Sequence, residues 1–127
     1  MPALERPLTR SANTRRLEHM SHETDILTRV RNAARKRILF LPHALQQMLR
    51  PDRMIRAHEI RFVIEQGEII EDYPADTRGH SCLMFGHTAG RPIHVVCAPR
   101  DEYLAVITAY LPNEEEWSVD FKTRIRR

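Results

Sequence analysis

Hydrophobic positions recur every three to four residues in three stretches of the chain, which is the period of an amphipathic α-helix. These stretches predict helices over residues 24–37, 42–49 and 57–66. The residues at their ends fit this interpretation, because Thr24 can cap a helix N-terminus, Pro42 is suited to a first turn, and Gly67 commonly ends a helix. The pattern therefore predicts three helices before residue 68.

Shorter apolar runs, separated by turns that contain Pro or Gly, indicate β-strands. Residues 38–41 form one such run, closed by Pro42, which predicts an edge strand. Four more strands are expected over residues 69–73, 81–87, 92–98 and 103–110. A turn centred on Ala89 and Gly90 would place Cys82 and Cys97 opposite each other on neighbouring strands.

Helices followed by a run of strands predict an α+β domain. We expect the helices over residues 42–49 and 57–66 to pack on one face of a four- to five-stranded antiparallel sheet, preceded by a basic N-terminal helix. A chain of 127 residues is long enough for one such core. The predicted organisation is a basic N-terminal extension over residues 1–37 and a folded domain over residues 38–127. Within the extension, residues 1–20 are expected to be disordered and residues 24–37 to be helical.

The positive charge is concentrated in the N-terminal extension. Residues 1–37 contain nine Arg or Lys against four Asp or Glu, whereas residues 38–127 contain eleven against thirteen. The net charge of +3 is therefore weak evidence that the domain binds nucleic acid, because a basic arm is more often solvated than bound in a groove. No stretch looks like a membrane span or a signal peptide, and two cysteines are too few for a disulfide framework. We expect a cytoplasmic protein with reduced thiols and no membrane partner.

Several short motifs occur in order along residues 38–127. They are His43-Ala44 followed by Met48, Arg53 ahead of a helix, Gly67-Glu68 with Tyr73, the run Gly90-Arg91-Pro92-Ile93-His94-Val95-Val96, the run Ile107-Thr108-Ala109-Tyr110 with Pro112, and Trp117 before a basic end. Together they resemble a small bacterial family known only as the domain of unknown function numbered forty-two fifty-eight. That family looks like a relative of the RelE/ParE toxin superfamily, whose members are small α+β domains encoded beside an antitoxin. One departure is Gln47, where the resemblance leads us to expect arginine, and it weakens a phosphate site at that helix.

The resemblance implies a toxin-like component of a toxin–antitoxin pair. RelE-type members cut ribosome-bound mRNA, so the implied activity is that of a metal-independent endoribonuclease, an mRNA interferase, with no cofactor. The implied partners are a cognate antitoxin of the zinc-finger or helix-turn-helix type and mRNA or the ribosome. The alternative is a non-catalytic protein-interaction module of the same fold, which binds a partner through its sheet edge or its basic helix. The slightly acidic charge of residues 38–127 favours this alternative.

RNA cleavage without a metal needs a base, an acid and a cation that stabilises the charge developing on the phosphate. Strand alternation places one set of side chains, His94, Val96 and Ala98, on one face of their strand. It places a second set on one face of the next strand, namely Leu104, Val106, Thr108 and Tyr110. If these two faces coincide, His94, Thr108 and Tyr110 lie close together.

The resemblance favours six site residues. The expected catalytic residues are His43, Arg53, His94 and Tyr110, and the expected substrate-binding residues are Thr108 and Arg91. A different interpretation stays open for both histidines. A histidine in a Val-rich strand, such as His94, is more often a hydrogen-bonded core residue, and His43 beside Pro42 can simply cap its helix.

Two His/Cys pairs look superficially like a zinc site. His80 and Cys82 share a strand face, but His94 and Cys97 are three residues apart and point to opposite faces. We therefore expect no metal site. Trp117, which follows an acidic run, is expected to anchor the C-terminal end rather than to stack on bases.

Overall fold

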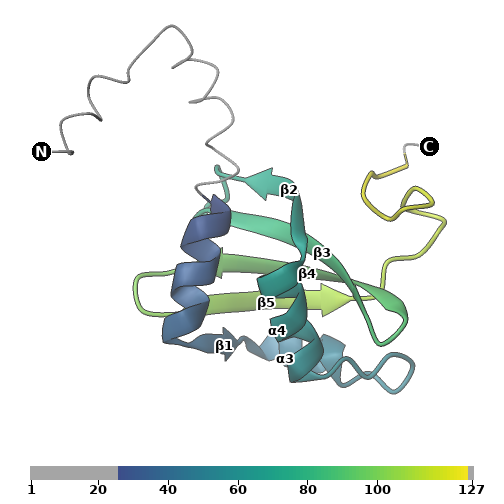
Figure 1. Ribbon diagram of the computed structural model, residues 1–127, viewed down its shortest axis with the longest axis horizontal. Helices are drawn as coiled ribbons and strands as arrows, with labels where there is room; N and C mark the ends of the chain where they lie inside the picture. The colour runs from purple at the N-terminus through teal and green to yellow at the C-terminus, as the bar shows by residue number, and fades with distance from the viewer. Residues whose placement is uncertain (1–25, 126–127) are drawn as a thin grey trace, which may run out of the picture.

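The computed structural model describes residues 26–125, which form a five-stranded sheet with helices around it (Figure 1). The strands are β1 (Ile38–Phe40), β2 (Glu68–Tyr73), β3 (Ser81–Thr88), β4 (Arg91–Pro99) and β5 (Leu104–Tyr110). The helices are α3 (Pro42–Met48), α4 (Ala57–Gln66) and a first helix over residues 26–36, which we call the N-terminal helix. None of these described helices is long and apolar enough to cross a membrane. Each element predicted within residues 26–125 is present, whereas the expected disorder of residues 1–20 and the cap at Thr24 lie outside the described residues.

The sheet is mixed rather than antiparallel throughout. Strands β2 to β5 form the predicted antiparallel meander, but β1 pairs with β5 in the parallel direction, with Ile38 opposite Leu104. The strand order is β1-β5-β4-β3-β2. The prediction of an antiparallel sheet was therefore wrong for β1. Its apolar pattern predicts a strand but no direction, and the long connection through α3 and α4 lets the chain return at the far edge of the sheet.

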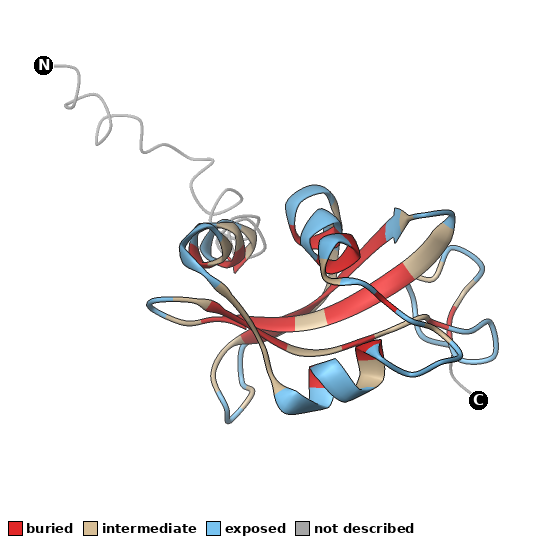
Figure 2. Ribbon diagram, turned by 90° about the horizontal axis from the view of Figure 1, so that it is seen from below, coloured by how far each residue is buried: buried red, intermediate tan, exposed pale blue. Residues whose placement is uncertain are grey.

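The helices lie on both sides of the sheet, not on one face as predicted. In Figure 2 the N-terminal helix and α4 cover one side, and α3 lies on the other. Helix α3 follows β1 after a single residue, Leu41, whose backbone N–H donates to the carbonyl of Val106, so the helix stays beside β5. Only Ala44 and Met48 of α3 are buried, whereas α4 buries an entire face.

The main hydrophobic core lies between the sheet and the layer formed by α4 and the N-terminal helix. Its members include Ile26, Val30, Ile60, Val63, Ile64, Cys82, Met84, Ile93, Val95, Cys97 and Val106. Gly86 permits the close packing of α4, since a Cβ atom there would lie 3.2 Å from a methyl carbon of Val63. Arg31 fixes the N-terminal helix in place by donating to the carbonyls of Ile64 and Gly67, at 3.0 Å each. The N-terminal helix thus belongs to the same core as the sheet.

A tight turn at Ala89 and Gly90 sets the register of the central hairpin. Both residues have positive φ angles, 57° and 76°, as a two-residue type I′ turn requires. Cys82 consequently lies opposite Cys97, and this predicted pairing is confirmed.

A β-bulge at Ile107 shifts the register between β4 and β5. Cys97 pairs with Val106, but its neighbour Val96 pairs with Thr108, so β5 contains one extra residue at this point. An extra residue reverses the alternation of side chains along the strand, so residues before and after the bulge exchange faces.

The bulge changes which residues of β5 share a face. Leu104 and Val106 belong to the main core, while Thr108 and Tyr110 lie on the other face of the sheet. The prediction that all four share one face was wrong, because strict alternation does not reveal a bulge. The part of that prediction that concerns the site is confirmed, since Tyr110 pairs directly with His94 and Thr108 follows on the same face.

Candidate functional site

His94 and Tyr110, which we call the central pair, form the middle of the candidate site. The register of β4 and β5 pairs the two residues, and Nδ1 of His94 lies 3.2 Å from the Tyr110 hydroxyl oxygen. The two rings meet edge-on, with their centroids 5.2 Å apart. The sequence predicted this proximity on the condition that the two strand faces coincide, and at these two residues they do.

Both ring nitrogens of His94 make hydrogen bonds. Nε2 lies 2.8 Å from the carbonyl oxygen of Phe121, which can only accept, so Nε2 carries a proton and donates it. Nδ1 then accepts from the hydroxyl of Tyr110. His94 is 0% exposed, and burial lowers its pKa to about 4, although the bond to the Phe121 carbonyl opposes this shift. Burial also raises the pKa of Tyr110. At neutral pH the pair is therefore a neutral imidazole beside a protonated phenol.

Residues 117–125, which we call the C-terminal segment, cover His94. The Trp117 ring packs edge-on against the imidazole with centroids 4.4 Å apart, and the guanidinium of Arg124 lies 4.7 Å from the centre of the Trp117 ring. The segment folds back through a bridge between Trp117 and Arg124, and Phe121 in the bend has a positive φ of 62°. Trp117 is buried, so the anchoring role expected for it is confirmed.

Two ion pairs hold the C-terminal segment against β2. Arg124 donates to both carboxylate oxygens of Glu71, at 2.9 and 3.1 Å. Lys122 lies 2.9 Å from a carboxylate oxygen of Glu68. The hydroxyl of Tyr73 also donates to Glu71. The segment is therefore attached to the sheet by charge as well as by the packing of Trp117.

The ionisation states of this cluster support one another. Burial tends to raise the pKa of Glu71, but the hydrogen bonds from Arg124 and Tyr73 outweigh it, and the pKa is lowered. Burial and the bond to Glu71 raise the pKa of Tyr73 to about 12. The bond to Glu71 also raises the pKa of Arg124. At neutral pH Glu71 is consequently an anion that accepts from a cation and a phenol.

Sequence reasoning missed Glu71, Phe121 and Arg124. Phe121 contributes a backbone carbonyl, which no pattern of side chains reveals. The fold-back that brings Arg124 to Glu71 passes through Phe121 at positive φ, a conformation that a bulky non-glycine residue rarely adopts. The opposite charges of β2 and the C-terminal end were the only available signal, and charge alone does not define a pairing.

The other predicted site residues lie apart from the central pair. Thr108 shares the face of the pair but is opposite Val96. His43 is exposed on α3, and Arg53 lies in the following loop, where its guanidinium is 3.4 Å from the amide oxygen of Gln47. Within residues 26–125, no hydrogen bond or ion pair joins His43, Arg53 or Thr108 to the central pair. Their catalytic and binding roles stay predictions.

Arg91, predicted to bind substrate, holds the loop before α4. It donates to the carbonyls of Arg53 and Met54, at 2.6 and 2.9 Å, and lies 3.1 Å from a carboxylate oxygen of Glu59. The Glu59 side chain is only 3% exposed. Burial tends to raise its pKa, but the backbone N–H of Arg56 and the guanidinium of Arg91 lower it more. Arg91 thus neutralises a buried carboxylate, and substrate binding by the same guanidinium stays a prediction.

The His and Cys residues considered as metal ligands do not gather at one site, because the two cysteines face the core and His80 lies away from them. Cys82 and Cys97 face the main core as free thiols, and the hydrogen bond between them, together with burial, raises the pKa of Cys97. The ring of His80 lies 2.6 Å from Asp72 and 3.1 Å from Arg29. In the described part of the chain, no three His, Cys, Asp or Glu side chains gather as metal ligands.

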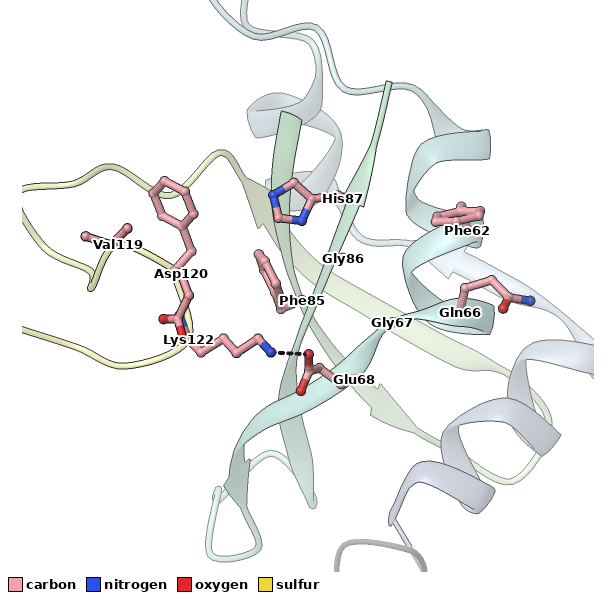
Figure 3. Close-up of a pocket in the computed structure, with 11 residues that line it drawn as sticks. Phe62, Gln66, Gly67, Glu68, Phe85, Gly86, His87, Val119, Asp120 and Lys122 are labelled. Carbon is pink, nitrogen blue, oxygen red and sulfur yellow. Dashed lines mark hydrogen bonds and ion pairs between the residues drawn. The ribbon is translucent and has the colours of Figure 1, made fainter. Parts of the chain in front are cut away.

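A cleft of about 550 Å³ lies between α4, β3 and the C-terminal segment (Figure 3). Its lining includes Phe62 and Gln66 of α4, Phe85 and His87 of β3, and residues 119–122. Figure 3 shows the ion pair of Lys122 with Glu68 beside it. None of the six predicted site residues lines this cleft. Phe85 and Phe121 connect it with the central pair, because both also contact His94.

Residues 40–111 match the model of a protein family described as Domain of unknown function (DUF4258). The match covers more than half of the chain and includes the central pair, whereas the N-terminal helix and the C-terminal segment lie outside it. Comparison with curated proteins and with solved structures finds no match. The family description names no activity, so the function has to be argued from the site.

Proposed function

The chain belongs to the DUF4258 family, and we propose that it is a RelE-like toxin component of a bacterial toxin–antitoxin pair, acting in the cytoplasm as a metal-independent endoribonuclease on mRNA. One observation carries this proposal. The central pair places an imidazole nitrogen 3.2 Å from a phenol hydroxyl, and these are the acid and base groups that a metal-free ribonuclease needs. The mixed α+β fold around a five-stranded sheet is compatible with the resemblance that the motifs indicate.

The proposed chemistry starts at Nε2 of His94. In the tautomer with the proton on Nδ1, His94 donates to the Tyr110 oxygen, and the lone pair on Nε2 can take the proton of an RNA 2′-hydroxyl. The 2′-oxygen then attacks the phosphorus while the bond to the 5′-oxygen breaks, which leaves a 2′,3′-cyclic phosphate. The phenol of Tyr110 protonates the leaving 5′-oxygen. The imidazolium returns its Nδ1 proton to the phenolate, so both residues regain their starting charge.

Access to Nε2 requires the C-terminal segment to move. Nε2 is bonded to the Phe121 carbonyl, and ion pairs with β2 hold the segment in place. RNA phosphates would compete with Glu71 and Glu68 for Arg124 and Lys122, so substrate binding favours release. Release also removes the burial that lowers the pKa of His94. Its pKa then rises toward the ordinary histidine value, at which imidazole is an effective base at neutral pH.

The test is a cell-free translation reaction in which primer extension follows an intact mRNA. Glu71→Gln weakens the attachment of the C-terminal segment, so we expect this protein to cut at least as fast as the wild type. In the same background, His94→Ala and Tyr110→Phe should be about 100-fold slower or more, the loss expected for removal of a general acid or base. His58→Ala is the matched control, because His58 is exposed on α4.

Thermal melting of each variant establishes that it is folded before its rate is compared. The proposal is rejected if neither the wild type nor Glu71→Gln cuts mRNA while the ribosomes are active and no antitoxin is present. It is also rejected if His94→Ala cuts as fast as its parent, because the central pair then takes no part in the reaction.

The closure of the site favours a second candidate function. His94 is bonded at both nitrogens and covered, an arrangement that suits a non-catalytic interaction module of the same fold. The slightly negative charge of residues 38–127 supports this candidate, since it disfavours RNA at short range. Such a module should bind a cognate antitoxin through its sheet edge or its basic helix, which isothermal titration calorimetry with the product of the adjacent gene would measure, and no variant should cut mRNA. Cleavage by any variant, or a neighbour that does not bind, would contradict it.

A further inference from the structure

The exposed side of the N-terminal helix is strongly basic. Residues 26–37 contain four arginines and one lysine and no acidic residue. The helix buries Ile26, Val30 and Ala33 against the sheet. Its exposed side carries Arg29, Arg35 and Lys36, and Arg37 follows directly after its last residue. The helix is thus amphipathic, with its cations directed away from the core.

Cations from other elements extend this surface on both flanks of the helix. A hollow of about 350 Å³ between the N-terminal helix and α4 is lined by Arg31, Arg35 and Arg61. A second hollow, of about 210 Å³ and beside the connection from β4 to β5, is lined by Arg29, Lys36 and Arg100. We call these six residues and Arg37 the basic face. Only two acidic residues, Glu65 and Asp101, line the hollows, so positive charge predominates.

The cations of the basic face have no carboxylate partner within residues 26–125. Among the described residues, the ion-paired cations lie elsewhere, at Arg50, Arg78, Arg91, Lys122 and Arg124. On the basic face, Arg29 meets a ring nitrogen of His80, and Lys36 donates to the backbone carbonyl of Asp101. The bond of Lys36 to a carbonyl satisfies the donor but leaves its positive charge uncompensated. The charge of Arg29 is offset only in part, because the Asp72 carboxylate lies on the far side of the His80 ring.

Support of the helix itself accounts for only part of this charge. Arg31 is used to hold α4, and cations in the last turn, such as Lys36 and Arg37, stabilise the helix dipole. Arg61 on α4 and Arg100 beside β4 have no such role toward the N-terminal helix. Cations gathered from three elements around one exposed ridge therefore indicate a partner that carries many negative charges.

We propose that the basic face binds the phosphate backbone of RNA. The choice of RNA as the polyanion rests on the proposed function. The existence of the basic face does not depend on that proposal. Six of the seven cations are arginines, whose planar guanidinium groups donate in pairs to phosphate oxygens. A strand of RNA that follows the helix would meet cations on both of its flanks, in the two hollows.

The basic face and the central pair lie on opposite sides of the sheet. The central pair is on the face that the C-terminal segment covers, whereas the N-terminal helix and α4 cover the other face (Figure 2). Contacts at the basic face therefore take no part in bond cleavage. Their loss should weaken binding and raise KM while kcat stays the same.

The test measures RNA binding by the full chain, with the fluorescence anisotropy of a labelled single-stranded RNA at a series of salt concentrations. The test variant is Arg35→Gln with Arg61→Gln, and the matched control is Arg50→Gln with Arg78→Gln. All four arginines are exposed and each variant loses two charges, but Arg50 and Arg78 are ion-paired with carboxylates. We expect the test variant to bind about tenfold more weakly and its salt slope to fall by about 1 to 2, while the control stays within about twofold of the wild type.

Three results overturn this proposal. The first is no RNA binding by the wild type, or an equal loss in the test and control variants. The second is a loss of RNA binding only when the arginines at positions 6, 10, 15 and 16 are replaced, because the binding site then lies within residues 1–25. The third is displacement of RNA by poly-glutamate at equal charge concentration, which would assign the surface to an acidic polypeptide. Binding is measured without cleavage, so a chain that binds RNA here but cuts no mRNA rejects the proposed ribonuclease and leaves the basic face established.

Discussion

The backbone carbonyl of Phe121 accepts a hydrogen bond from Nε2 of His94 across 2.8 Å. This bond joins the C-terminal segment, which lies outside the family match, to a residue inside it. It also fixes the tautomer of the ring, because a proton held on Nε2 leaves Nδ1 to accept from Tyr110. If Nδ1 gains a proton, it becomes a donor that faces another donor, the hydroxyl of Tyr110. The O–H bond of Tyr110 must then rotate away so that its oxygen can accept. The charge of His94 and the closure of the site are therefore coupled.

Acidification is expected to destabilise the fold through His94. Burial holds its pKa at about 4 in the folded chain, against an ordinary value of 6.5. Between these two values the unfolded chain binds more protons, so the free energy of unfolding rises with pH across this window. The contribution of His94 is complete above about pH 6.5, and roughly 3 kcal/mol is lost as the pH falls to about 4. The free energy of unfolding, measured with urea, should be lower at about pH 5 than at about pH 7, and His94 should account for roughly 2 kcal/mol of this difference.

His94→Gln is the control for this pH dependence, because glutamine keeps a donor and an acceptor but does not titrate. The variant should be less stable than the wild type at neutral pH and should lose most of the difference between the two pH values. The assignment to His94 fails if both proteins show the same dependence, since the titration of other groups would then explain it.

The closure of the C-terminal segment can be followed by fluorescence, because Trp117 is the only tryptophan in the chain. Its ring is buried against His94 and held through Arg124 by the ion pair with Glu71. Glu71→Gln should loosen the segment, shift the emission of Trp117 to longer wavelength and increase its quenching by acrylamide. Glu65→Gln is the matched control, since Glu65 is an exposed glutamate on α4. Equal quenching in both variants would show that the ion pair does not hold the segment closed.

The features that could be predicted from the sequence are those that local residues determine. Pro42 and Gly67 mark helix ends, and the turn at Ala89 and Gly90 fixes the register that brings Cys82 opposite Cys97. A two-residue turn leaves only one register, so this long-range pairing follows from a short-range signal. Alternation also places Thr108 and Tyr110 on one face of their strand, but the sequence left open whether this face coincides with that of His94.

The features that were missed depend on parts of the chain far apart in sequence. The direction of β1 and the side on which α3 packs depend on where the chain returns to the sheet, and apolar periodicity is the same in either case. The bulge at Ile107 and the fold-back at Phe121 are single-residue departures from regular geometry with no local signature. The site is covered because the chain folds back at Phe121, and Phe121 belongs to none of the motifs. The motifs therefore could not predict that the site is closed.

Arg91 is expected to matter for stability through the buried carboxylate of Glu59. Arg91→Ala leaves that carboxylate, whose side chain is 3% exposed, without its cation. We expect the free energy of unfolding to fall by about 3 kcal/mol, because an unpaired buried charge is costly. The double variant with Glu59→Gln should regain part of this loss, and urea unfolding measures both. Arg50→Ala, which breaks an exposed pair with Asp52, is the control and should change stability little. A loss no larger than in this control would contradict the role of Arg91.

The two thiols of the core provide a test of the central register that does not depend on function. Cys82 and Cys97 are paired across β3 and β4 and are 0% exposed. The hydrogen bond from Cys82 and burial raise the pKa of Cys97, which leaves little thiolate to act as a nucleophile. In the native protein neither thiol should react with an aromatic disulfide reagent, and both should react at the rate of free cysteine once urea unfolds the chain. With Cys82→Ala, one thiol should react per chain and again only on unfolding. Fast reaction in the native state would mean that this face of β3 and β4 is open to solvent, and the register that also places His94 opposite Phe85 would then be in error.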